Sequence, residues 1–315
     1  MANEKYEVFL IDSIAPEAKA ALAETCTVID KGDPAMDEWP ERAHAVITRT
    51  SYIKGEMIAR SKRLKVIAKH GIGVDHIDIP AASAKGIPVI NTPGTNAQSV
   101  AELTAMLTVA AARNTRPAEA AMRTGNSGDT FNWRGFDITG RRVGIIGLGN
   151  VGRRTAPIFL HGFNCPVTAY DPYITDEPFE TLGVKRAPSL EALLSETDIL
   201  CLHVPLNDET RHMVGARELA LLPTGAMVIN AARGGIVAED AWYDALKSGH
   251  LYAGASDVFE VEPPPADHPL FSLKNFLATP HIGAATSDSA RRSGETVVKL
   301  VLEILNGGPA RTRVN

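Results

Sequence analysis

Short apolar segments recur along the chain, most of them beginning roughly 20 to 30 residues after the one before, with amphipathic sequence between them. Their apolar character is continuous rather than alternating, which is typical of strands covered on both faces, as in parallel sheets with crossover helices. The pattern therefore predicts an α/β fold. The expected strands are residues 7–11, 45–48, 65–68, 88–90, 142–146, 167–170, 198–202, 226–229, 252–256 and 276–279.

Two longer segments stand apart from this alternation. Residues 96–113 are rich in alanine and leucine and contain no proline, which favours a long helix. Residues 286–305 carry apolar side chains at helical spacing, and the following Gly307-Gly308-Pro309 is typical of a helix end. We therefore expect one long helix near the middle of the chain and another near its end.

A glycine-rich motif in the middle of the chain predicts two domains. Gly147-x-Gly149-x-x-Gly152 is typical of the start of a dinucleotide-binding fold, yet four predicted strands precede it. Those strands need a domain of their own, and the last helix has no strand to follow, so we expect it to return to that first domain. The prediction is a first domain of residues 1–99 and 285–315, a dinucleotide-binding Rossmann domain of residues 100–284, and a cleft between them, in which a substrate would bind.

The sequence around the glycine motif indicates a site for NAD. A predicted strand ends at residue 146, and a helix can begin directly after Asn150. Gly147 allows a tight turn, Gly149 lets a pyrophosphate approach the backbone, and Gly152 lets the helix pack on the strand. Asp171 follows the next strand, 19 residues after Gly152, where a carboxylate accepts hydrogen bonds from ribose hydroxyls and repels a 2′-phosphate. We therefore expect NAD rather than NADP.

Composition and charge argue against several other classes of protein. The 315 residues carry a net charge of −5 with both signs interspersed, which provides no basic stripe for nucleic acid. No apolar run approaches the ~18 residues of a membrane span, and the polar N-terminus does not resemble an export signal. Cys26, Cys165 and Cys201 are far apart and form no metal-binding motif, so we expect no metal and a reducing, cytoplasmic location.

Side chains suited to hydride transfer follow the later strands. Oxidation of a hydroxyl-bearing carbon needs a base for the hydroxyl proton and a cation for the substrate acid. Arg233 precedes two glycines that would leave its guanidinium uncovered for a carboxylate, and His281 offers an imidazole. Glu262 could orient His281, with Glu260 as the rival carboxylate, and Asp257 could accept a hydrogen bond from the nicotinamide carboxamide. Arg233, His281 and Asp257 each also have a purely structural alternative as a turn or loop residue.

Four ordered motifs resemble the D-isomer-specific 2-hydroxyacid dehydrogenase family, and the resemblance extends over about residues 45–305. Together they are far more specific than any one alone. The motifs are Gly147-x-Gly149-x-x-Gly152 with Asp171, then Ala232-Arg233-Gly234-Gly235, Asp257-Val-Phe-Glu-Val-Glu-Pro-Pro264 and Pro280-His281-Ile-Gly-Ala-Ala-Thr286.

The resemblance implies roles for the three catalytic candidates. Arg233 would bind the substrate carboxylate, His281 would be the acid-base, and Glu262, directly before the prolines, would be its partner instead of Glu260. The resemblance also implies a discontinuous, flavodoxin-like substrate domain and a homodimer formed through the NAD-binding domain.

Further positions follow from the same resemblance. Asn150 and Val151 would contact the pyrophosphate, while Val204, Ala231 and Gly283 would line the cofactor site near the nicotinamide. His203, next to Val204, is interpreted as a structural residue at a strand end. The backbone amides of an early glycine loop would receive the substrate carboxylate; its residues are Gly71, Ile72 and Gly73.

The substrate is less well defined than the reaction. Asn91-Thr-Pro-Gly94 and Ser99-Val-Ala-Glu-Leu103 resemble phosphoglycerate dehydrogenases, which would make 3-phosphoglycerate and 3-phosphohydroxypyruvate the pair. However, chains of that group often carry a regulatory domain after the point where this sequence ends, and Ser51 replaces a second arginine in the loop Arg49-Thr50-Ser51. Glycerate with hydroxypyruvate, glyoxylate, sulfolactate, lactate and tartrate-like acids therefore stay open. The candidates for binding a second anionic group of the substrate are Arg49, His70 and Arg134.

A non-enzymatic protein is the alternative to a dehydrogenase. Corepressors related to this family keep the same arginine, glutamate and histidine but sense NAD without catalysis. They carry added tails and partner grooves that we do not find in this sequence. We therefore expect an enzyme.

Overall fold

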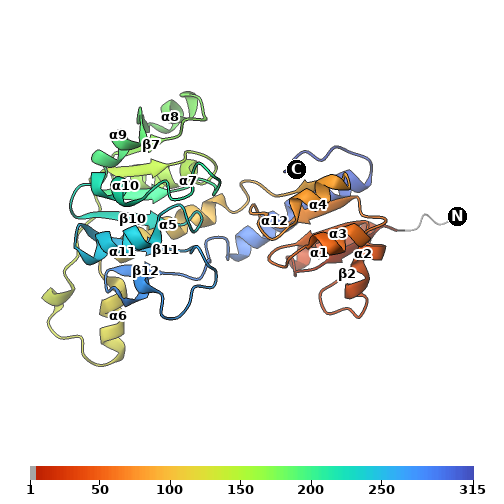
Figure 1. Cartoon of the computed structure of the whole chain (residues 1–315), viewed down its shortest axis with the longest axis horizontal. Helices are drawn as coiled ribbons and strands as arrows, with labels where there is room; N and C mark the ends of the chain where they lie inside the picture. Colours follow the sequence, from red (N-terminus) through yellow and green to blue (C-terminus); the bar gives the residue numbers. More distant parts are fainter. Residues whose placement is uncertain (1–4) are drawn as a thin grey trace. The chain divides into compact units, whose positions relative to one another are not determined.

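The computed structural model describes residues 5–315, which divide into two compact units. One unit contains the described residues up to Asn96 together with Ala285–Asn315, and the other is Ala97–Ala284 (Figure 1). Residues 1–4 of the predicted first domain lie outside the described part. Each unit contains one parallel β-sheet with helices around it. The predicted α/β fold with two parallel sheets is confirmed.

The first unit is built on a five-stranded sheet of order β2-β1-β3-β4-β5, in which all neighbouring strands are parallel. This is the order of flavodoxin-like folds. The strands are β1 (Glu7–Leu10), β2 (Thr27–Ile29), β3 (Ala45–Thr48), β4 (Val66–Lys69) and β5 (Val89–Ile90). The helices are α1 (Pro16–Thr25), η1 (Met36–Glu38), α2 (Trp39–Arg42), α3 (Gly55–Arg60), α4 (Ile79–Ala84) and α12 (Ser287–Leu305).

Helix α12 belongs to the first unit although it comes last in the sequence (Figure 1). The side chain of Thr286 caps it by accepting a hydrogen bond from the Ser289 amide. Its apolar face joins the core of the β-sheet through Val297 and Val301. A Cβ on Gly294 would lie 2.9 Å from the Cβ of Ala18 in α1, so the glycine allows these two helices to pack closely.

The second unit is built on a seven-stranded sheet of order β12-β11-β10-β9-β6-β7-β8, again with parallel neighbours. The chain starts in the middle at β6 and reverses direction between β6 and β9, which is the switch point where dinucleotides bind in Rossmann folds. The strands are β6 (Val143–Ile146), β7 (Val167–Tyr170), β8 (Lys185–Arg186), β9 (Ile199–Leu202), β10 (Ala226–Asn230), β11 (Leu251–Ser256) and β12 (Phe276–Ala278).

Helices cover both faces of this second sheet. Along β9, Ile199 and Cys201 belong to one apolar cluster, and Leu200 and Leu202 belong to the other. Burial raises the pKa of the Cys201 thiol to about 12, as expected for a structural cysteine. The helices are α5 (Ala97–Ala112), α6 (Thr115–Arg123), η2 (Thr130–Trp133), α7 (Gly152–Pro157), the π-helical turn η3 (Ile158–Gly162), α8 (Glu177–Leu182), α9 (Leu190–Ser195), α10 (Ala216–Leu221), α11 (Glu239–Lys247) and η4 (Pro269–Ser272).

The structure adds two strands that the apolar pattern did not predict. Both β2 and β8 are short and lie at an edge of their sheet, where side chains need not be apolar. The helix expected after Asn150 is also interrupted. It is α-helical only as far as Pro157 and continues as η3, because proline has no amide hydrogen for the helical ladder. None of the helices formed by residues 5–315 is long and apolar enough to span a membrane.

Candidate active site

The glycine motif forms the turn between β6 and α7. Gly147 adopts a left-handed conformation with φ of 89°, and its amide donates to the Tyr170 carbonyl at 2.9 Å. A Cβ on Gly147 would lie 2.7 Å from the His203 carbonyl oxygen, and one on Gly152 would lie 2.2 Å from the Gly147 carbonyl oxygen. At Gly149, by contrast, an added Cβ would have no atom of the described chain within 4 Å apart from those of residues 148–150. Two glycines therefore allow close backbone packing, and the third leaves one side of the loop accessible.

The start of α7 presents backbone donors beside this accessible glycine. The Leu148 amide donates to the Asp171 carboxylate at 2.9 Å. Within residues 5–315, no acceptor pairs with the amides of Gly149, Asn150 and Val151. Unpaired amides at the start of a helix bind anions such as pyrophosphate, so these residues fit a dinucleotide.

Asp171 closes the other side of the loop. It follows β7, and its second carboxylate oxygen accepts a hydrogen bond from the Tyr173 amide at 3.1 Å. Each oxygen keeps a lone pair beyond these two bonds. The carboxylate is therefore held against the glycine loop and can still accept hydrogen bonds from hydroxyl groups.

His203 supports the glycine loop from the end of β9. Its carbonyl oxygen packs against Gly147, and its Nε2 lies 3.0 Å from the Thr155 hydroxyl. Burial lowers the pKa of His203 to about 3, so the ring is neutral at physiological pH. The structural interpretation of His203 agrees with this geometry. Val204 follows it, and its Cγ1 would lie 2.8 Å from a Cβ on Gly147.

Glu262 and His281 form a hydrogen-bonded pair. The Nδ1 of His281 lies 2.7 Å from Oε2 of Glu262, and Oε1 of Glu262 accepts the Phe259 amide at 3.0 Å. An ionised carboxylate can only accept, so Nδ1 carries the hydrogen and Nε2 is left as the basic nitrogen. Both side chains are partly exposed. The pair can hold and move a proton at Nε2 of His281.

The surroundings of Glu262 favour its ionised form. Burial alone would raise the pKa of its carboxyl, but hydrogen bonds from His281 and the Phe259 amide lower it, as do the charges of His281 and Arg233. The net pKa is below its ordinary value. The negative charge of Glu262 therefore faces the imidazole of His281.

Asp257 organises the loop that carries His281. The His281 backbone is left-handed, with φ of 52°, and its amide donates to the Asp257 carbonyl at 2.8 Å. The buried Asp257 carboxylate accepts hydrogen bonds from the Thr279 hydroxyl at 2.6 Å, the Ile282 amide at 2.8 Å and the Gly283 amide at 2.7 Å. Sequence reasoning assigned Asp257 to the nicotinamide and missed this role, because nothing in the local pattern marks these partners.

Arg233 lies near Glu262 because the backbone of its own loop approaches that of the glutamate loop. A Cβ on Gly234 would lie 1.9 Å from the Phe259 carbonyl oxygen, so only glycine fits there. The side chain of Asn230, at the end of β10, donates to the Arg233 carbonyl at 2.9 Å, and the Arg233 guanidinium donates to the Ala232 carbonyl at 2.6 Å. These contacts fix the turn that presents the guanidinium.

Glu260, the rival carboxylate, has another partner. It lies 2.9 Å from Nε2 of His212, and its amide donates to Glu239 at 2.8 Å. Glu239 also pairs with His268 at 3.0 Å. The loop around Glu262 is therefore fixed on both sides by histidine–carboxylate pairs.

The first unit holds the remaining substrate candidates except Arg134. The Gly71 amide donates to the Thr92 hydroxyl at 2.9 Å, whereas the amides of Ile72 and Gly73 pair with no acceptor among residues 5–315. His70 is buried, and its Nε2 lies 3.1 Å from the Ala290 carbonyl of α12. Of this stretch, the two amides after Gly71 have no acceptor within the described residues, while His70 packs against a helix.

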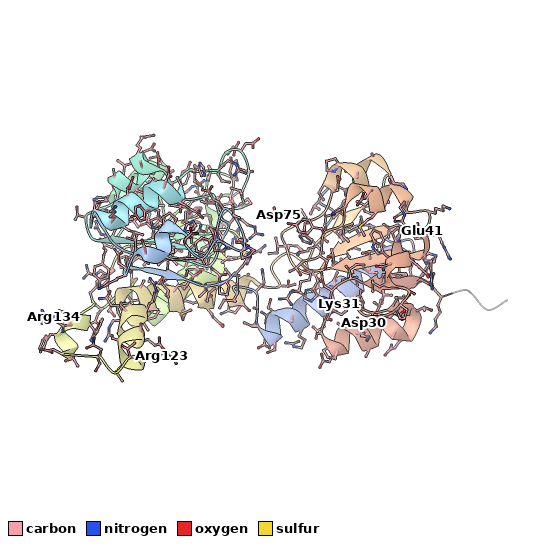
Figure 2. All side chains as sticks on the ribbon, turned by 60° about the horizontal axis from the view of Figure 1, so that its bottom comes forward. Asp30, Lys31, Glu41, Asp75, Arg123 and Arg134 are labelled. Atoms are coloured by element: carbon pink, nitrogen blue, oxygen red, sulfur yellow. The ribbon has the colours of Figure 1, made fainter. Side chains whose placement is uncertain are left out.

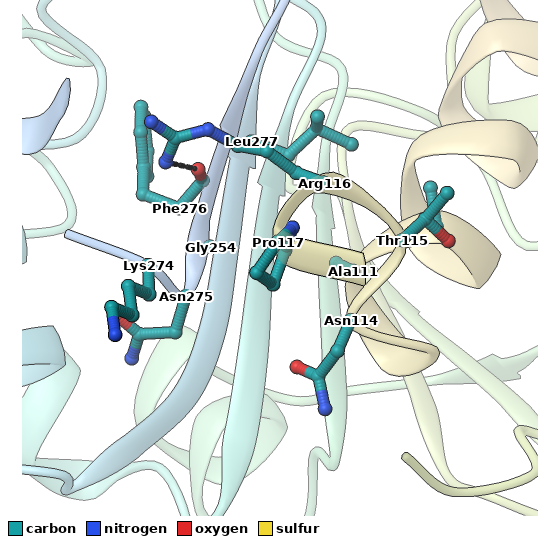
Figure 3. Close-up of a pocket in the computed structure, with 11 residues that line it drawn as sticks. Ala111, Asn114, Thr115, Arg116, Pro117, Gly254, Lys274, Asn275, Phe276 and Leu277 are labelled. Carbon is teal, nitrogen blue, oxygen red and sulfur yellow. Dashed lines mark hydrogen bonds between the residues drawn. The ribbon is translucent and has the colours of Figure 1, made fainter. Parts of the chain in front are cut away.

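Arg134 and a nearby pocket provide no comparable site. Arg134 lies in the same segment of the second unit as α6 (Figure 2), and its guanidinium stacks 5.0 Å from the Phe131 ring centre. The pocket in Figure 3 lies between α6 and β12, where the Arg116 guanidinium donates to the carbonyls of Leu273 and Phe276. The Arg116 guanidinium therefore binds backbone carbonyls of the protein itself. In the described part of the chain, no cluster of histidine, cysteine or acidic side chains could hold a metal ion.

Comparison with protein families identifies the second unit. Residues 105–283 match the family model described as D-isomer specific 2-hydroxyacid dehydrogenase, NAD binding domain. The chain belongs to the D-isomer-specific 2-hydroxyacid dehydrogenase family. The predictions of this family and of NAD as the cofactor are confirmed.

Named relatives act on different acids. The D-3-phosphoglycerate dehydrogenase of Methanocaldococcus jannaschii is 40% identical over 270 residues, which cover 86% of this chain and 51% of that protein. The hydroxypyruvate reductase of Thermotoga maritima is 38% identical over 311 residues, which cover 96% of this chain and 99% of that protein. The chain thus spans about half the length of the first relative and nearly all of the second.

A solved structure agrees with this assignment. A glyoxylate reductase from Paecilomyes thermophila has a TM-score of 0.85 with 26% sequence identity, and the match covers 98% of each chain. The names of these relatives differ in the acid but share the class of reaction.

Proposed function

We propose that this protein oxidises a small D-2-hydroxy acid to its 2-keto acid, or catalyses the reverse reduction, with NAD. The observation that carries the proposal is the His281–Glu262 pair, with 2.7 Å between Nδ1 and Oε2 and Arg233 close enough to lower the pKa of Glu262. A base, its orienting carboxylate and a cation for the substrate acid are the groups that this chemistry needs.

His281 is the proposed acid-base. Bound NAD supplies the hydride acceptor. As the C2–H bond of the hydroxy acid breaks, Nε2 of His281 takes the hydroxyl proton, and Glu262 stabilises the imidazolium that forms. In the direction of reduction, the same nitrogen returns the proton to the keto oxygen.

Substrate recognition is assigned to both units. We assign the described residues up to 99 with 285–315 to substrate binding, and residues 100–284 to NAD binding. Arg233 would bind the acid's carboxylate in a two-pronged contact, which suits the planar guanidinium. The loop of Gly71, Ile72 and Gly73 would add backbone donors, chiefly the two amides without an internal acceptor. Arg49 would bind a second polar or anionic group.

The cofactor residues follow from the glycine loop. Gly147 and Gly152 would shape the turn around the pyrophosphate, Gly149 would let it approach, and the amides of Asn150 and Val151 would bind it. Asp171 would accept from the adenosine ribose. Residues proposed near the nicotinamide are Val204, Ala231, Asp257 and Gly283.

The test is NADH formation from a panel of D- and L-2-hydroxy acids, plain, phosphorylated and sulfonated. We expect activity with a D-acid and a fall in kcat of about 10²- to 10⁴-fold in His281→Ala. His212→Ala is the matched control, because His212 also has a φ of 52° and also pairs with a glutamate of the same loop. NAD binding without turnover of any acid in the wild-type chain would refute the proposal in favour of an NAD-sensing binding protein.

We also propose a homodimer formed through the NAD-binding unit, located in the cytoplasm. The support for a dimer is exposed apolar surface in that unit, where Met122 and Phe131 are 67% and 69% exposed. The support for the location is three cysteines that are all buried as free thiols. Light scattering tests the dimer, and we expect Phe131→Ser to weaken it.

A further inference from the structure

The loop that carries Arg49 is fixed by one buried carboxylate. Asp12 follows β1 and is 6% exposed. Its Oδ2 accepts hydrogen bonds from the amides of Arg49 at 2.7 Å, Thr50 at 2.8 Å and Ser51 at 2.9 Å. The Thr48 hydroxyl donates to the same oxygen at 3.1 Å, and the Ser51 hydroxyl donates to Oδ1 at 2.8 Å. Five donors from four consecutive residues therefore converge on Asp12.

These contacts keep Asp12 ionised. Burial alone would raise the pKa of its carboxyl, but the hydrogen bonds from Ser51, Thr50 and Arg49 outweigh burial and hold the pKa well below its usual range. Three successive amides that face one point form a nest of the kind that binds anions. Here the protein's own carboxylate fills the nest, so these amides are not donors for a bound acid.

A second charged side chain holds the same loop from the neighbouring strand. Lys69 ends β4, which pairs with β3, and its ammonium group donates to the Arg49 carbonyl. The Lys69 ammonium also lies 3.4 Å from Nε2 of His76. Burial, together with the charge of Lys69, lowers the pKa of His76 to about 4, so His76 is neutral near Lys69. The Arg49 backbone is thus bound on both sides, by Asp12 at its amide and by Lys69 at its carbonyl.

We propose that Asp12 is a positioning residue for substrate binding: it fixes the loop so that Arg49 meets the acid through its guanidinium and not through the backbone. Ser51 then stabilises the loop and does not bind the substrate, because its hydroxyl and its amide both donate to Asp12. The inference rests on the proposed function, in which Arg49 contacts the acid.

The kinetic test is a double-mutant cycle with Asp12→Asn and Arg49→Ala. Asparagine keeps the size of Asp12 but replaces an acceptor with an NH₂ group that faces N–H donors. We expect the KM for the best acid of the panel to rise about 10- to 100-fold in Asp12→Asn, because small displacements of a binding group have effects of this size. The KM for NAD and kcat should change less than about threefold. Asp37→Asn, which removes an exposed carboxylate in the same unit, is the control.

The double mutant decides whether Asp12 acts through Arg49. If it does, Asp12→Asn adds little to the KM of Arg49→Ala, because the two residues then share one interaction. Additive effects, or a KM for the acid that Asp12→Asn leaves unchanged, would overturn the inference. If Asp12→Asn does not fold, Ser51→Ala removes one of the five contacts, and its KM for the acid should rise severalfold.

Hydrogen exchange separates this inference from the proposed function. The amides of Arg49, Thr50 and Ser51 should exchange slowly in the wild-type chain and at least about tenfold faster in Asp12→Asn, because their acceptor is weakened. Equal exchange in both proteins would refute the anchoring role even if the enzyme is active. A wild-type chain that oxidises no acid but shows the exchange difference would refute the proposed function and leave the anchor in place.

Discussion

The contrast between two glycines of one loop gives a sharp test of the NAD site. An alanine at position 152 would place its Cβ 2.2 Å from the Gly147 carbonyl oxygen, whereas ordinary contacts begin at 3.4 Å. The backbone would have to move by about 1 Å, and overpacking of this kind costs about 1–3 kcal/mol. For a unit of this size, that cost lowers Tm by about 2–12 °C.

Alanine at position 149 should have the opposite effects. Within the described chain, no atom apart from those of residues 148–150 lies within 4 Å of that Cβ, and the φ of Gly149 is not left-handed, so stability should change by less than about 0.5 kcal/mol. The new methyl group would stand beside the amides proposed to bind pyrophosphate. Loss of one hydrogen bond to a charged group costs about 1.5–3 kcal/mol, which raises the Kd for NAD about 10- to 150-fold.

Thermal unfolding by circular dichroism and calorimetric titration with NAD measure the two effects separately. Gly162→Ala is the control, since its Cβ would also meet no described atom within 4 Å and it lies outside the loop. We expect it to change neither quantity. If Gly149→Ala binds NAD as tightly as the wild type does, the pyrophosphate does not lie against these amides. If Gly152→Ala unfolds at the wild-type temperature, the close contact with Gly147 is wrong.

Three further predictions concern charge and protonation. Glu262→Gln keeps the size of the side chain but replaces the charged acceptor of the Nδ1 hydrogen of His281 with an amide, so kcat should fall about tenfold or more while the KM for NAD stays unchanged; an unchanged kcat would exclude Glu262 as the partner. Asp171→Ala should raise the KM for NAD about tenfold or more while lowering kcat less, and an unchanged KM would contradict the ribose assignment. His203 has a pKa of about 3 in the folded chain, below its unfolded value of about 6.5. The unfolded chain therefore binds a proton that the folded chain does not, and stability falls as the pH drops from about 6.5 towards 3, by up to about 1.4 kcal/mol per pH unit. Chemical unfolding should show a shallower loss over this range in His203→Gln, and equal slopes would place the lost stability in other groups.

The strands of both sheets were largely predictable from the sequence. The segments 45–48 and 167–170 agree with β3 and β7 residue for residue, because parallel strands inside a sheet have nearly continuous apolar sequences. The edge strands β2 and β8 lack that constraint and were missed. Helix α12 was also predictable, since its apolar spacing and its end signals are local features of the chain.

The candidate site was predictable in its residue types but not in its pairings. The sequence placed Glu260 and Glu262 equally well beside His281, and only the resemblance to the family favoured Glu262. In the folded chain, Glu262 bonds His281 and Glu260 bonds His212. The path of the loop backbone decides which glutamate pairs with which histidine. It directs the carboxylate of Glu262 toward His281 and that of Glu260 toward His212.

The sequence by itself determined the class of fold, the cofactor and the family. Each of these follows from the periodicity of apolar residues or from motifs of a few adjacent residues. Only the tertiary structure decided that Asp12 bonds the Arg49 amide, 37 residues away, and that Asp257 bonds the Gly283 amide, 26 residues away. Buried carboxylates need partners because desolvation is costly. Which amides supply those partners depends on where neighbouring strands end in space, and no local pattern of residues encodes that position.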